Sequence, residues 1–456
     1  MHFVIVGGGA AGSLLALLVL RHAPASVRVT LVDRRAAFGR GLAYSAPAPH
    51  HRINVPADKM GGVAPADETG FIDWLAASGR PVEGFEQSFI PRAWFGDYLA
   101  AQLDAARAGG RLQFRHGDIT ALAREPGGRW SCTGPGLSLC ADQVALCPGN
   151  PPPALWPTVP AGASGPRLVA DVWVPGALEA VGACDSVLIA GTGATAIDAL
   201  LDLDQRGHRG GITMTSRRGL LPLVDVPPGP YPDFFDPAVA RRGLRSVLRR
   251  LREEVRTAAA QGVPWQHVVD AFRVHAANTW LQLGEADRRR FLRHGRAHWM
   301  VHRHRLAPDI AGRLEGMIAE GRLTLLAGRV RATRITADGC ELELLTPRSM
   351  PLRLAADWML NCIGPSEDFS RLDDPLWVAL FRGGIVRSGP LNLGLDVDPQ
   401  LRLIDLEGRA HPDLFCLGLP TRGHFWEITA VVHIRQQAEA LALQLFPAAV
   451  SVPAAA

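Results

Sequence analysis

The stretch Val4-Ile5-Val6-Gly7-Gly8-Gly9-Ala10-Ala11-Gly12 is a short apolar run that leads directly into a glycine-rich turn. Residues 3–6 are apolar and mostly β-branched, as in a buried parallel strand, and residues 14–20 continue as an apolar helix. Gly7, Gly9 and Gly12 have the spacing G-x-G-x-x-G. In that spacing the first glycine permits a tight turn, the second lets backbone approach a pyrophosphate, and the third lets the helix lie close to the strand. The stretch therefore predicts a strand, turn and helix that bind a dinucleotide.

A second apolar strand, residues 27–33, follows the helix and ends in Asp33. An acid about twenty residues after the last glycine is placed to accept a hydrogen bond from a ribose hydroxyl. One alternative is a βαβ unit that binds nothing, and another is a signal peptide. The signal peptide is disfavoured because the segment lacks a positively charged start, and cleavage would remove the strand and the turn.

Composition excludes several classes of protein. The 456 residues leave room for about three domains. Lys and Arg number 48 against 44 Asp and Glu, a net charge of +4, which is too balanced to indicate nucleic-acid binding. No apolar run is long enough to span a bilayer, so we expect a soluble, cytoplasmic protein with no membrane partner. The seven cysteines never occur as C-x-x-C, which suits a reducing compartment and provides neither a simple dithiol relay nor a zinc pattern.

A long loop over residues 34–60 contains the pair His50-His51 and the segment Asn54-Val55-Pro56. Loops of this length in a compact domain often carry function. The histidine pair could bind a metal, but no carboxylate or cysteine stands at ligand spacing, so we expect surface histidines and no metal site. Two amphipathic helices are predicted after the loop, around residues 71–75 and 93–99.

Period-two patterning begins at residue 112 and predicts a small antiparallel meander of strands over residues 112–116, 119–123 and 130–132. The meander ends in a buried strand, residues 143–147, that breaks into Pro148-Gly149. The prolines at 151–153 then mark a plausible domain boundary.

The same layout begins again at residue 186. Residues 186–198 read as a strand, a G-x-G-x-x-A turn at Gly191, Gly193 and Ala196, and a helix. Strands over 322–326, 330–335 and 341–345 repeat the meander, and residues 358–365 end it as residues 145–149 ended the first. One glycine turn is weak evidence, whereas two in matching frames indicate a duplicated dinucleotide-binding unit.

We therefore expect an α/β protein with two Rossmann-like dinucleotide-binding domains, each with a small antiparallel meander, plus a helical insertion. The predicted division has five parts: FAD-binding domain 1–155 and 351–456, NADP-binding domain 156–236 and 322–350, and insertion 237–321. The insertion has Leu244, Leu248, Leu251 and Val255 at helical spacing among arginines. This pattern favours a solvated basic face with an apolar stripe against the body, with membrane or nucleic-acid contact as the alternative.

A second basic segment, residues 299–305, contains His302, Arg303, His304 and Arg305. Guanidinium groups gathered in this way can bind an anion or an anionic substrate. The alternative is an ion-paired helix end.

The strands after the two turns end differently, and this difference predicts the cofactors. Asp33 ends the first, whereas Ser216-Arg217-Arg218 ends the second. A carboxylate accepts from a ribose 2′-hydroxyl and repels a 2′-phosphate, and arginine does the reverse. We expect FAD at the first turn and NADPH at the second. Alternatively, Arg217 and Arg218 contact the helical insertion.

These residues carry a family resemblance. The chain resembles the flavoproteins with two dinucleotide-binding domains, and among them a group of bacterial FAD/NAD(P)-binding proteins. More distantly it is similar to flavin-dependent N-hydroxylases and other class B-type monooxygenases. The matching stretches are GGGAAG, GRGLAYSAPAPHHRINVPADKM, IPRAWFGDYL, GTGATAIDALLDLDQRGHRGGITMTSRRGLLP, WMVHRHRLAP, NCIGP and GLPTRGHFWEITAVVHIRQQAEALA.

The resemblance implies roles for particular residues. Gly7, Gly9 and Gly12 would hold the FAD pyrophosphate, Asp33 the adenosine ribose, and Gly191, Gly193 and Ala196 the NADPH pyrophosphate. The Asn54-Val55-Pro56 loop would run beside the isoalloxazine, and residues 417–419, with Gly418, would lie near the ribityl and pyrimidine end. Two features depart from the pattern: no aspartate follows Gly418, and no clear monooxygenase fingerprint lies between the two turns.

Candidate catalytic residues lie where the flavin is expected to react. Gly423-His424-Phe425-Trp426-Glu427 is predicted to open the last helix, whose N-terminus would stabilise negative charge on reduced flavin. His424 and Glu427 are candidates for tuning that charge, and Asn54 joins them through its loop. Alternatively, Glu427 is a first-turn carboxylate that only favours its helix.

The sequence thus predicts an oxidoreductase in which NADPH reduces FAD and the reduced flavin then serves the conversion of a small-molecule substrate. The resemblance favours a monooxygenase that acts on a small amine or another soft nucleophile. A flavin reductase or dehydrogenase without oxygenation stays open, as does a non-catalytic flavin-binding sensor. The sequence gives no indication of quaternary state.

Overall fold

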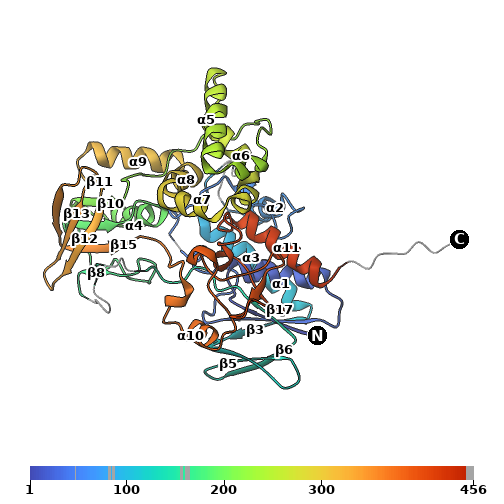
Figure 1. The fold of residues 1–456 in the computed structure, drawn as a ribbon. Coiled ribbons are helices and arrows are strands. Elements are labelled where there is room, and N and C mark those ends of the chain that lie inside the picture. The colour runs from blue at the N-terminus through green and yellow to red at the C-terminus, as the bar shows by residue number, and fades with distance from the viewer. Residues whose placement is uncertain (47, 81–83, 85–87, 155–157, 160–164, 448–456) are drawn as a thin grey trace. The chain divides into compact units, whose positions relative to one another are not determined.

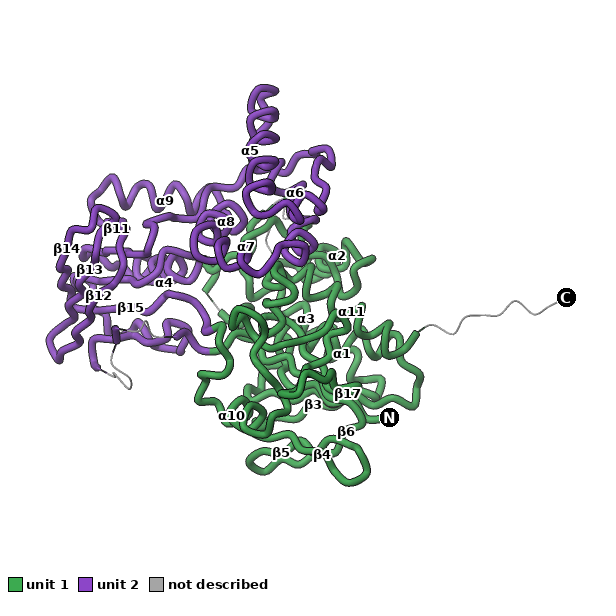
Figure 2. Tube along the Cα trace, in the orientation of Figure 1, with its two compact units in different colours: residues 1–151, 367–456 green, residues 152–366 purple. Residues whose placement is uncertain are grey.

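The computed structural model describes residues 1–46, 48–80, 84, 88–154, 158–159 and 165–447. The chain forms two compact units, which Figure 2 colours separately: residues 1–151 with 367–456 (unit 1), and residues 152–366 (unit 2). The predicted division placed residues 351–366 with the first domain, and this is wrong. They belong to unit 2 because strand β15 (Trp358–Asn361) pairs with strand β9 (Val187–Ala190).

Unit 1 is built on a six-stranded sheet of order β16-β17-β7-β1-β2-β3. The strands are β1 (His2–Val6), β2 (Arg28–Asp33), β3 (Leu112–His116), β7 (Gln143–Leu146), β16 (Arg402–Ile404) and β17 (Ala410–Cys416). Only β16 is antiparallel to its neighbour. Strand β1 lies between β2 and β7, and its interior residues Phe3, Val4 and Ile5 are fully buried. The run that opens the glycine turn is therefore the centre of the sheet.

Helices cover this sheet. They are α1 (Ala10–His22), α2 (Gly70–Ala77), α3 (Arg92–Ala108), α10 (Pro375–Arg382) and α11 (Val431–Leu445). Helix α1 is buried on most sides, as its nearly continuous apolar sequence predicts, and it packs beside α11 (Figure 1). Short 3-10 segments occur at Ala57–Lys59, Phe369–Arg371, Pro390–Asn392 and Leu419–Thr421.

The antiparallel meander of unit 1 consists of β4 (Ala121–Arg124), β5 (Trp130–Gly134) and β6 (Leu137–Ala141). The prediction that residues 112–116 open this meander is wrong, because β3 pairs in parallel with β2 in the main sheet. Alternation of apolar and polar residues identifies a strand but does not identify its partner.

Unit 2 repeats the plan with a five-stranded parallel sheet of order β11-β10-β9-β15-β8. Its other strands are β8 (Leu168–Val169), β10 (Ile212–Ser216) and β11 (Leu323–Ala327), and helix α4 (Ala194–Gln205) follows β9. The meander is β12 (Arg329–Ile335), β13 (Cys340–Leu345) and β14 (Pro351–Ala356). As in unit 1, the strand expected to open the meander, here β11, lies in the parallel sheet. The predicted fold class, two Rossmann-like domains each with a meander, is confirmed.

The helical insertion is also confirmed. It contains a 3-10 segment (Pro237–Arg242), α5 (Leu244–Ala260), α6 (Trp265–Gln282), α7 (Glu285–Arg290), a π-helical turn (Phe291–Gly295), α8 (Arg296–Arg303) and α9 (Pro308–Ala319). The apolar stripe of α5 packs into a local core through Leu244 and Val247, while Arg245 and Arg249 on its other side are exposed. None of the described helices is long and apolar enough to span a membrane.

Asp204, near the end of α4, joins three parts of unit 2. Its carboxylate accepts hydrogen bonds from Arg313 Nε on α9 at 2.8 Å and from Arg322 Nη2 before β11 at 2.9 Å, and its side chain is 5% exposed. Burial acts to raise the pKa of Asp204, but the hydrogen bonds from Arg322 and Arg313 outweigh it and hold that pKa below its ordinary value.

We predict that Asp204→Asn lowers the free energy of unfolding by about 1–3 kcal/mol, because two guanidinium groups lose their charged acceptor. The carboxylate contributes stability above its unfolded pKa of about 3.9 and loses that contribution as the pH falls through its lower folded pKa. Urea unfolding should therefore show a larger difference from wild type at pH 7 than at pH 3. Asp338→Asn, in an exposed turn of the same unit, is the control. Equal stability of both variants at pH 7 contradicts the assignment.

Candidate dinucleotide sites

The first glycine turn is fixed by steric constraints. Gly7 has φ +111°, and a Cβ at this position would lie 2.0 Å from the carbonyl oxygen of Cys147, the residue after β7. A Cβ on Gly12 would lie 1.9 Å from the carbonyl oxygen of Gly7. Neither position tolerates a side chain, so the predicted roles of tight turn and close helix packing match the structure.

Gly9 is the N-cap of α1 and has ordinary extended geometry, φ −75° and ψ −170°. No side chain caps the helix, so the N–H groups of its first turn meet no side-chain acceptor. An uncapped helix N-terminus carries partial positive charge and suits a phosphate. A Cβ on Gly9 would lie 3.2 Å from Cα of Gly41, in the G-R-G sequence of residues 39–41. Sequence reasoning missed Gly41 as part of this site, although that sequence was a visible signal.

Asp33 lies at the turn, as predicted, and is 7% exposed. Its Oδ2 accepts a hydrogen bond from the Gly8 N–H at 2.7 Å, and its Oδ1 accepts from the Arg35 N–H at 2.7 Å. The carboxylate therefore braces the glycine turn. Its contact with a ribose hydroxyl stays a prediction.

The second turn has the same geometry. Gly191 has φ +124°, and a Cβ there would lie 2.2 Å from the carbonyl oxygen of Cys362, the residue after β15. The Gly191 N–H donates to the Thr215 carbonyl at 2.8 Å, as the Gly7 N–H donates to the Val32 carbonyl at 2.7 Å. The duplication inferred from sequence therefore extends to individual backbone hydrogen bonds.

Gly193 is the N-cap of α4, again without a side-chain cap, at φ −90° and ψ −169°. A Cβ on Gly193 would have no heavy atom within 4 Å, so the space in front of this turn is open. Ala196 stands where the first turn has Gly12 and is fully buried. This turn therefore leaves room for backbone to approach a phosphate.

Arg217 and Arg218 follow β10 directly and are both exposed. Neither makes a hydrogen bond or ion pair with the described part of the chain, the helical insertion included. Their strand end is held instead by Ser216, whose Oγ accepts from Thr192 Oγ1 at 2.9 Å and from the Gly219 N–H at 3.0 Å. The two guanidinium groups are thus available to an anionic ligand.

The loop before α2 is anchored at both sides of Asn54. The N–H of Ile53 donates to the Ile90 carbonyl at 3.0 Å, and that of Ala57 donates to the Ser88 carbonyl at 3.1 Å. Asn54 itself is exposed, and Val55 and Pro56 are half-buried. The predicted flavin contact of these three residues stays a prediction.

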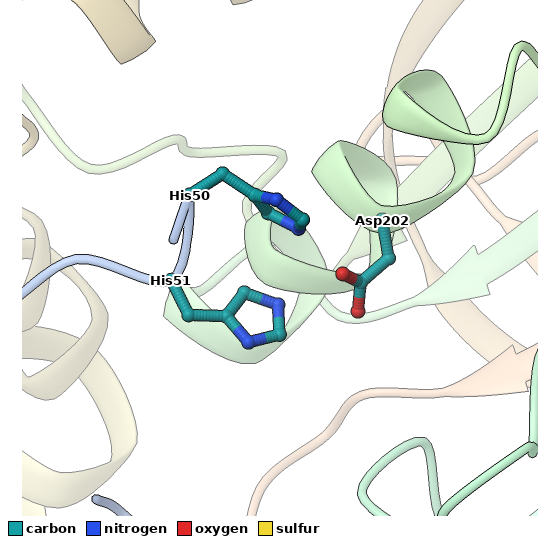
Figure 3. A group of neighbouring side chains, drawn as sticks. All are labelled: His50, His51 and Asp202. Atoms are coloured by element: carbon teal, nitrogen blue, oxygen red, sulfur yellow. The ribbon is translucent and has the colours of Figure 1, made fainter. Parts of the chain in front are cut away.

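The pair His50-His51 precedes this segment, with ring centroids 4.7 Å apart and an edge-on arrangement (Figure 3). Asp202, which Figure 3 also labels, lies on α4 of unit 2. His51 is buried, so the prediction that both are surface histidines is wrong for this residue.

The last strand, β17, ends at Cys416, and Gly418 follows in the conformation φ +81°, ψ −150°. A Cβ on Gly418 would lie 3.7 Å from Cβ of Ala11, in the first turn of α1. The structure therefore brings Gly418 to the same end of the sheet as the first glycine turn.

The predicted position of His424 and Glu427 on the last helix is wrong. Helix α11 begins at Val431, and residues 422–430 form turns before it. The Thr421 carbonyl accepts hydrogen bonds from the N–H groups of His424 and Phe425, and these bonds hold the segment in turns. Glu427 is 3% exposed and is not a first-turn carboxylate, and the His424 ring packs 4.6 Å from that of Phe425. A tuning role for either residue stays a prediction.

The basic segment at the end of α8 contains an ion-paired arginine. Arg305 is 6% exposed, with Nε 3.0 Å from Asp225 Oδ1 and Nη2 2.6 Å from Asp270 Oδ1. Arg303 is also buried and contacts the ring of His304, while His302 Nδ1 donates to the His298 carbonyl at 2.7 Å. Arg305 is therefore ion-paired, as in the alternative to anion binding that the sequence left open.

Comparisons with known proteins bear on the first unit and on the fold. Residues 4–151 match the FAD-NAD(P)-binding family. A search of curated proteins finds no match.

Solved structures share the fold at low sequence identity. An ornithine hydroxylase from Pseudomonas aeruginosa is 16% identical, with 98% of each chain covered and a TM-score of 0.67. An ornithine N-hydroxylase from Kutzneria sp. 744, solved with reduced FAD, NADP+ and L-ornithine, is 16% identical over 97% of this chain and 98% of that one, with a TM-score of 0.63. A thioredoxin reductase from Lactococcus lactis is 13% identical over 98% of each chain, with a TM-score of 0.53.

Substitution of the two glycines of the second turn by alanine should have opposite effects on stability and on dinucleotide binding. Gly191→Ala should lower the free energy of unfolding by about 3 kcal/mol or more, because the methyl group clashes with backbone at a positive φ. Gly193→Ala should change stability by less than about 0.5 kcal/mol, because its backbone geometry suits alanine. Gly193→Ala should nevertheless weaken dinucleotide binding about tenfold or more, since the methyl group occupies the path of the pyrophosphate.

Thermal unfolding and NADPH titration of both variants provide the measurements. A stable Gly193→Ala protein that binds NADPH as tightly as wild type contradicts the placement of the pyrophosphate.

Proposed function

We propose that this chain, whose residues 4–151 match the FAD-NAD(P)-binding family, is an FAD-dependent oxidoreductase that uses NADPH. The observation that carries the proposal is the pair of glycine turns with the same backbone geometry and opposite charge at the following strand end. Asp33 braces the first turn, whereas Arg217 and Arg218, after the second, are exposed and make no ion pair with the residues that the structure describes.

The residues of unit 1 fit FAD. Gly9 leaves the N-terminus of α1 uncapped, and the Gly41 backbone opposite lacks a side chain that would block it. We assign the pyrophosphate to this N-terminus and the adenosine ribose to the Asp33 carboxylate. When bound, the flavin and nicotinamide supply hydride transfer, and the protein supplies orientation and electrostatics.

The residues of unit 2 fit NADPH in preference to NADH. Gly193 faces open space at the N-terminus of α4, where a pyrophosphate would be held. Arg217 and Arg218 would pair with the ribose 2′-phosphate, an arrangement in which a planar guanidinium donates two hydrogen bonds to one anion.

For the reaction after flavin reduction, we favour monooxygenation of a small amine or another soft nucleophile. In balanced form, the substrate, O2, NADPH and H+ yield the hydroxylated product, water and NADP+. Two enzymes that hydroxylate ornithine share the fold over almost the whole chain.

A reductase is the second candidate, because a thioredoxin reductase also shares the fold. Disulfide reduction needs a reactive dithiol, and this sequence has no C-x-x-C. Moreover, Cys147 and Cys416 are buried, and burial raises the pKa of both thiols. A reductase of this chain would therefore pass electrons to an organic acceptor. A non-catalytic sensor is disfavoured because it would need no second nucleotide turn.

We predict that NADPH mixed anaerobically with the FAD-loaded protein bleaches the oxidised-flavin absorbance near about 450 nm. A flavin that stays oxidised with both NADPH and NADH would overturn the enzyme proposal. When oxygen and a panel of diamines and basic amino acids are then admitted, hydroxylated product should form in step with NADPH consumption. NADPH oxidation that yields only hydrogen peroxide with every amine, together with rapid turnover of a quinone, would favour the reductase.

We predict that Arg217→Ala raises the half-saturating NADPH concentration about tenfold or more, since a hydrogen bond to a charged group contributes about 1.5–3 kcal/mol. The value for NADH, which lacks the 2′-phosphate, should change less than about twofold. Arg348→Ala, which removes an exposed arginine elsewhere in unit 2, is the control. Equal effects on the two nucleotides would refute the 2′-phosphate assignment.

A further inference from the structure

Helix α11 carries two buried polar side chains whose purpose the proposed function does not explain. Its apolar stripe, which includes Ile434, Ala438 and Leu441, belongs to the core that contains α1. Arg435 and Gln437 border this stripe on its two sides, because residues two positions apart on a helix point about 200° apart. They are 4% and 6% exposed. The helix therefore directs one polar side chain to each side of its apolar stripe.

Both ends of the Gln437 amide bond to the loop after β17. Its Oε1 accepts from the Gly418 N–H at 3.0 Å, and its Nε2 donates to Thr421 Oγ1 at 3.0 Å. The Thr421 hydroxyl in turn donates to the Gly418 carbonyl at 2.8 Å. This closed network is buried, and buried networks with every member satisfied specify one conformation.

Arg435, on the other side of the apolar stripe, binds the segment that contains Gly62. Its Nη1 donates to the Gly62 carbonyl at 2.5 Å, and a Cβ on Gly61 would overlap its guanidinium. Burial lowers the pKa of Arg435, while the nearby Tyr98 and Asp67 act to raise it. The segment that follows Asn54-Val55-Pro56 is thus tied to the same helix as Gly418.

The loop that Gln437 fixes lies beside the first glycine turn. Gly418 faces Ala11, and its conformation, φ +81° and ψ −150°, is essentially restricted to glycine. The next residue, Leu419, begins a 3-10 turn, and its N–H makes no hydrogen bond with the described residues. Since the Leu419 side chain is apolar, the polar group that this loop offers at the carboxyl end of the sheet is a backbone donor. In open α/β sheets, ligands bind at that end.

We infer that Gln437 is a positioning residue for the flavin, and that through Gly418 it presents the Leu419 N–H to the pyrimidine edge of the isoalloxazine. The inference rests on the proposed function, since it takes unit 1 to bind FAD. A backbone donor at that edge stabilises the negative charge that reduction places on the flavin. Gln437 therefore acts on both flavin affinity and reduction potential without contacting the substrate.

The test compares Gln437→Leu with Gln436→Leu, an identical change at the exposed neighbouring position. Gln437→Leu should raise the FAD dissociation constant at least tenfold and, at saturating FAD, make the midpoint potential more negative. Gln436→Leu should stay within twofold of wild type in affinity and keep its potential. Gln437→Glu retains an acceptor for the Gly418 N–H, so it should restore affinity to within about threefold of wild type. Its added negative charge should still make the potential more negative.

Each outcome decides the inference. A folded Gln437→Leu protein with the affinity and potential of Gln436→Leu overturns it, as does a Gln437→Glu protein with an unchanged potential. If Gln437→Leu fails to fold, Gln437→Glu gives the decision alone. Failure of the wild-type protein to bind FAD would instead overturn the proposed function.

Discussion

The contact between a turn glycine and the carbonyl after the neighbouring strand constrains both halves of this protein. Gly7 lies against the Cys147 carbonyl, and Gly191 against that of Cys362, with no room for a side chain in either case. Each contact joins the strand that leads into a glycine turn to the strand that follows a meander. The position of each helix N-terminus, and hence of each proposed phosphate site, depends on it.

Around this shared constraint the two units differ in what they present to a ligand. The first brings an acid to the turn, and Asp33 uses both carboxylate oxygens on backbone N–H groups. The second leaves two arginines exposed and unpaired among the described residues. Backbone geometry thus accounts for what the sites have in common, and the charge at one strand end accounts for what distinguishes them.

Much of the fold and the geometry of each glycine turn could be predicted from sequence. Tight turns, uncapped helix starts and strand ends are local, so glycine spacing and the residue that ends a strand were sufficient. Strand partners were not, and β3 and β11 were assigned to the meanders although both pair in parallel sheets. The start of α11 was also misplaced, because a buried turn of apolar residues before a helix reads like the helix itself.

By itself, the sequence determined two glycine turns, the strands and helices around them, and the charge contrast between Asp33 and Arg217. These depend on residues within a few positions of one another. Only the tertiary structure placed Gly418 beside Ala11, tied it to Gln437, and held Gly62 with Arg435. Those contacts join residues far apart in the chain, and no periodicity records which distant backbone group a buried side chain will meet.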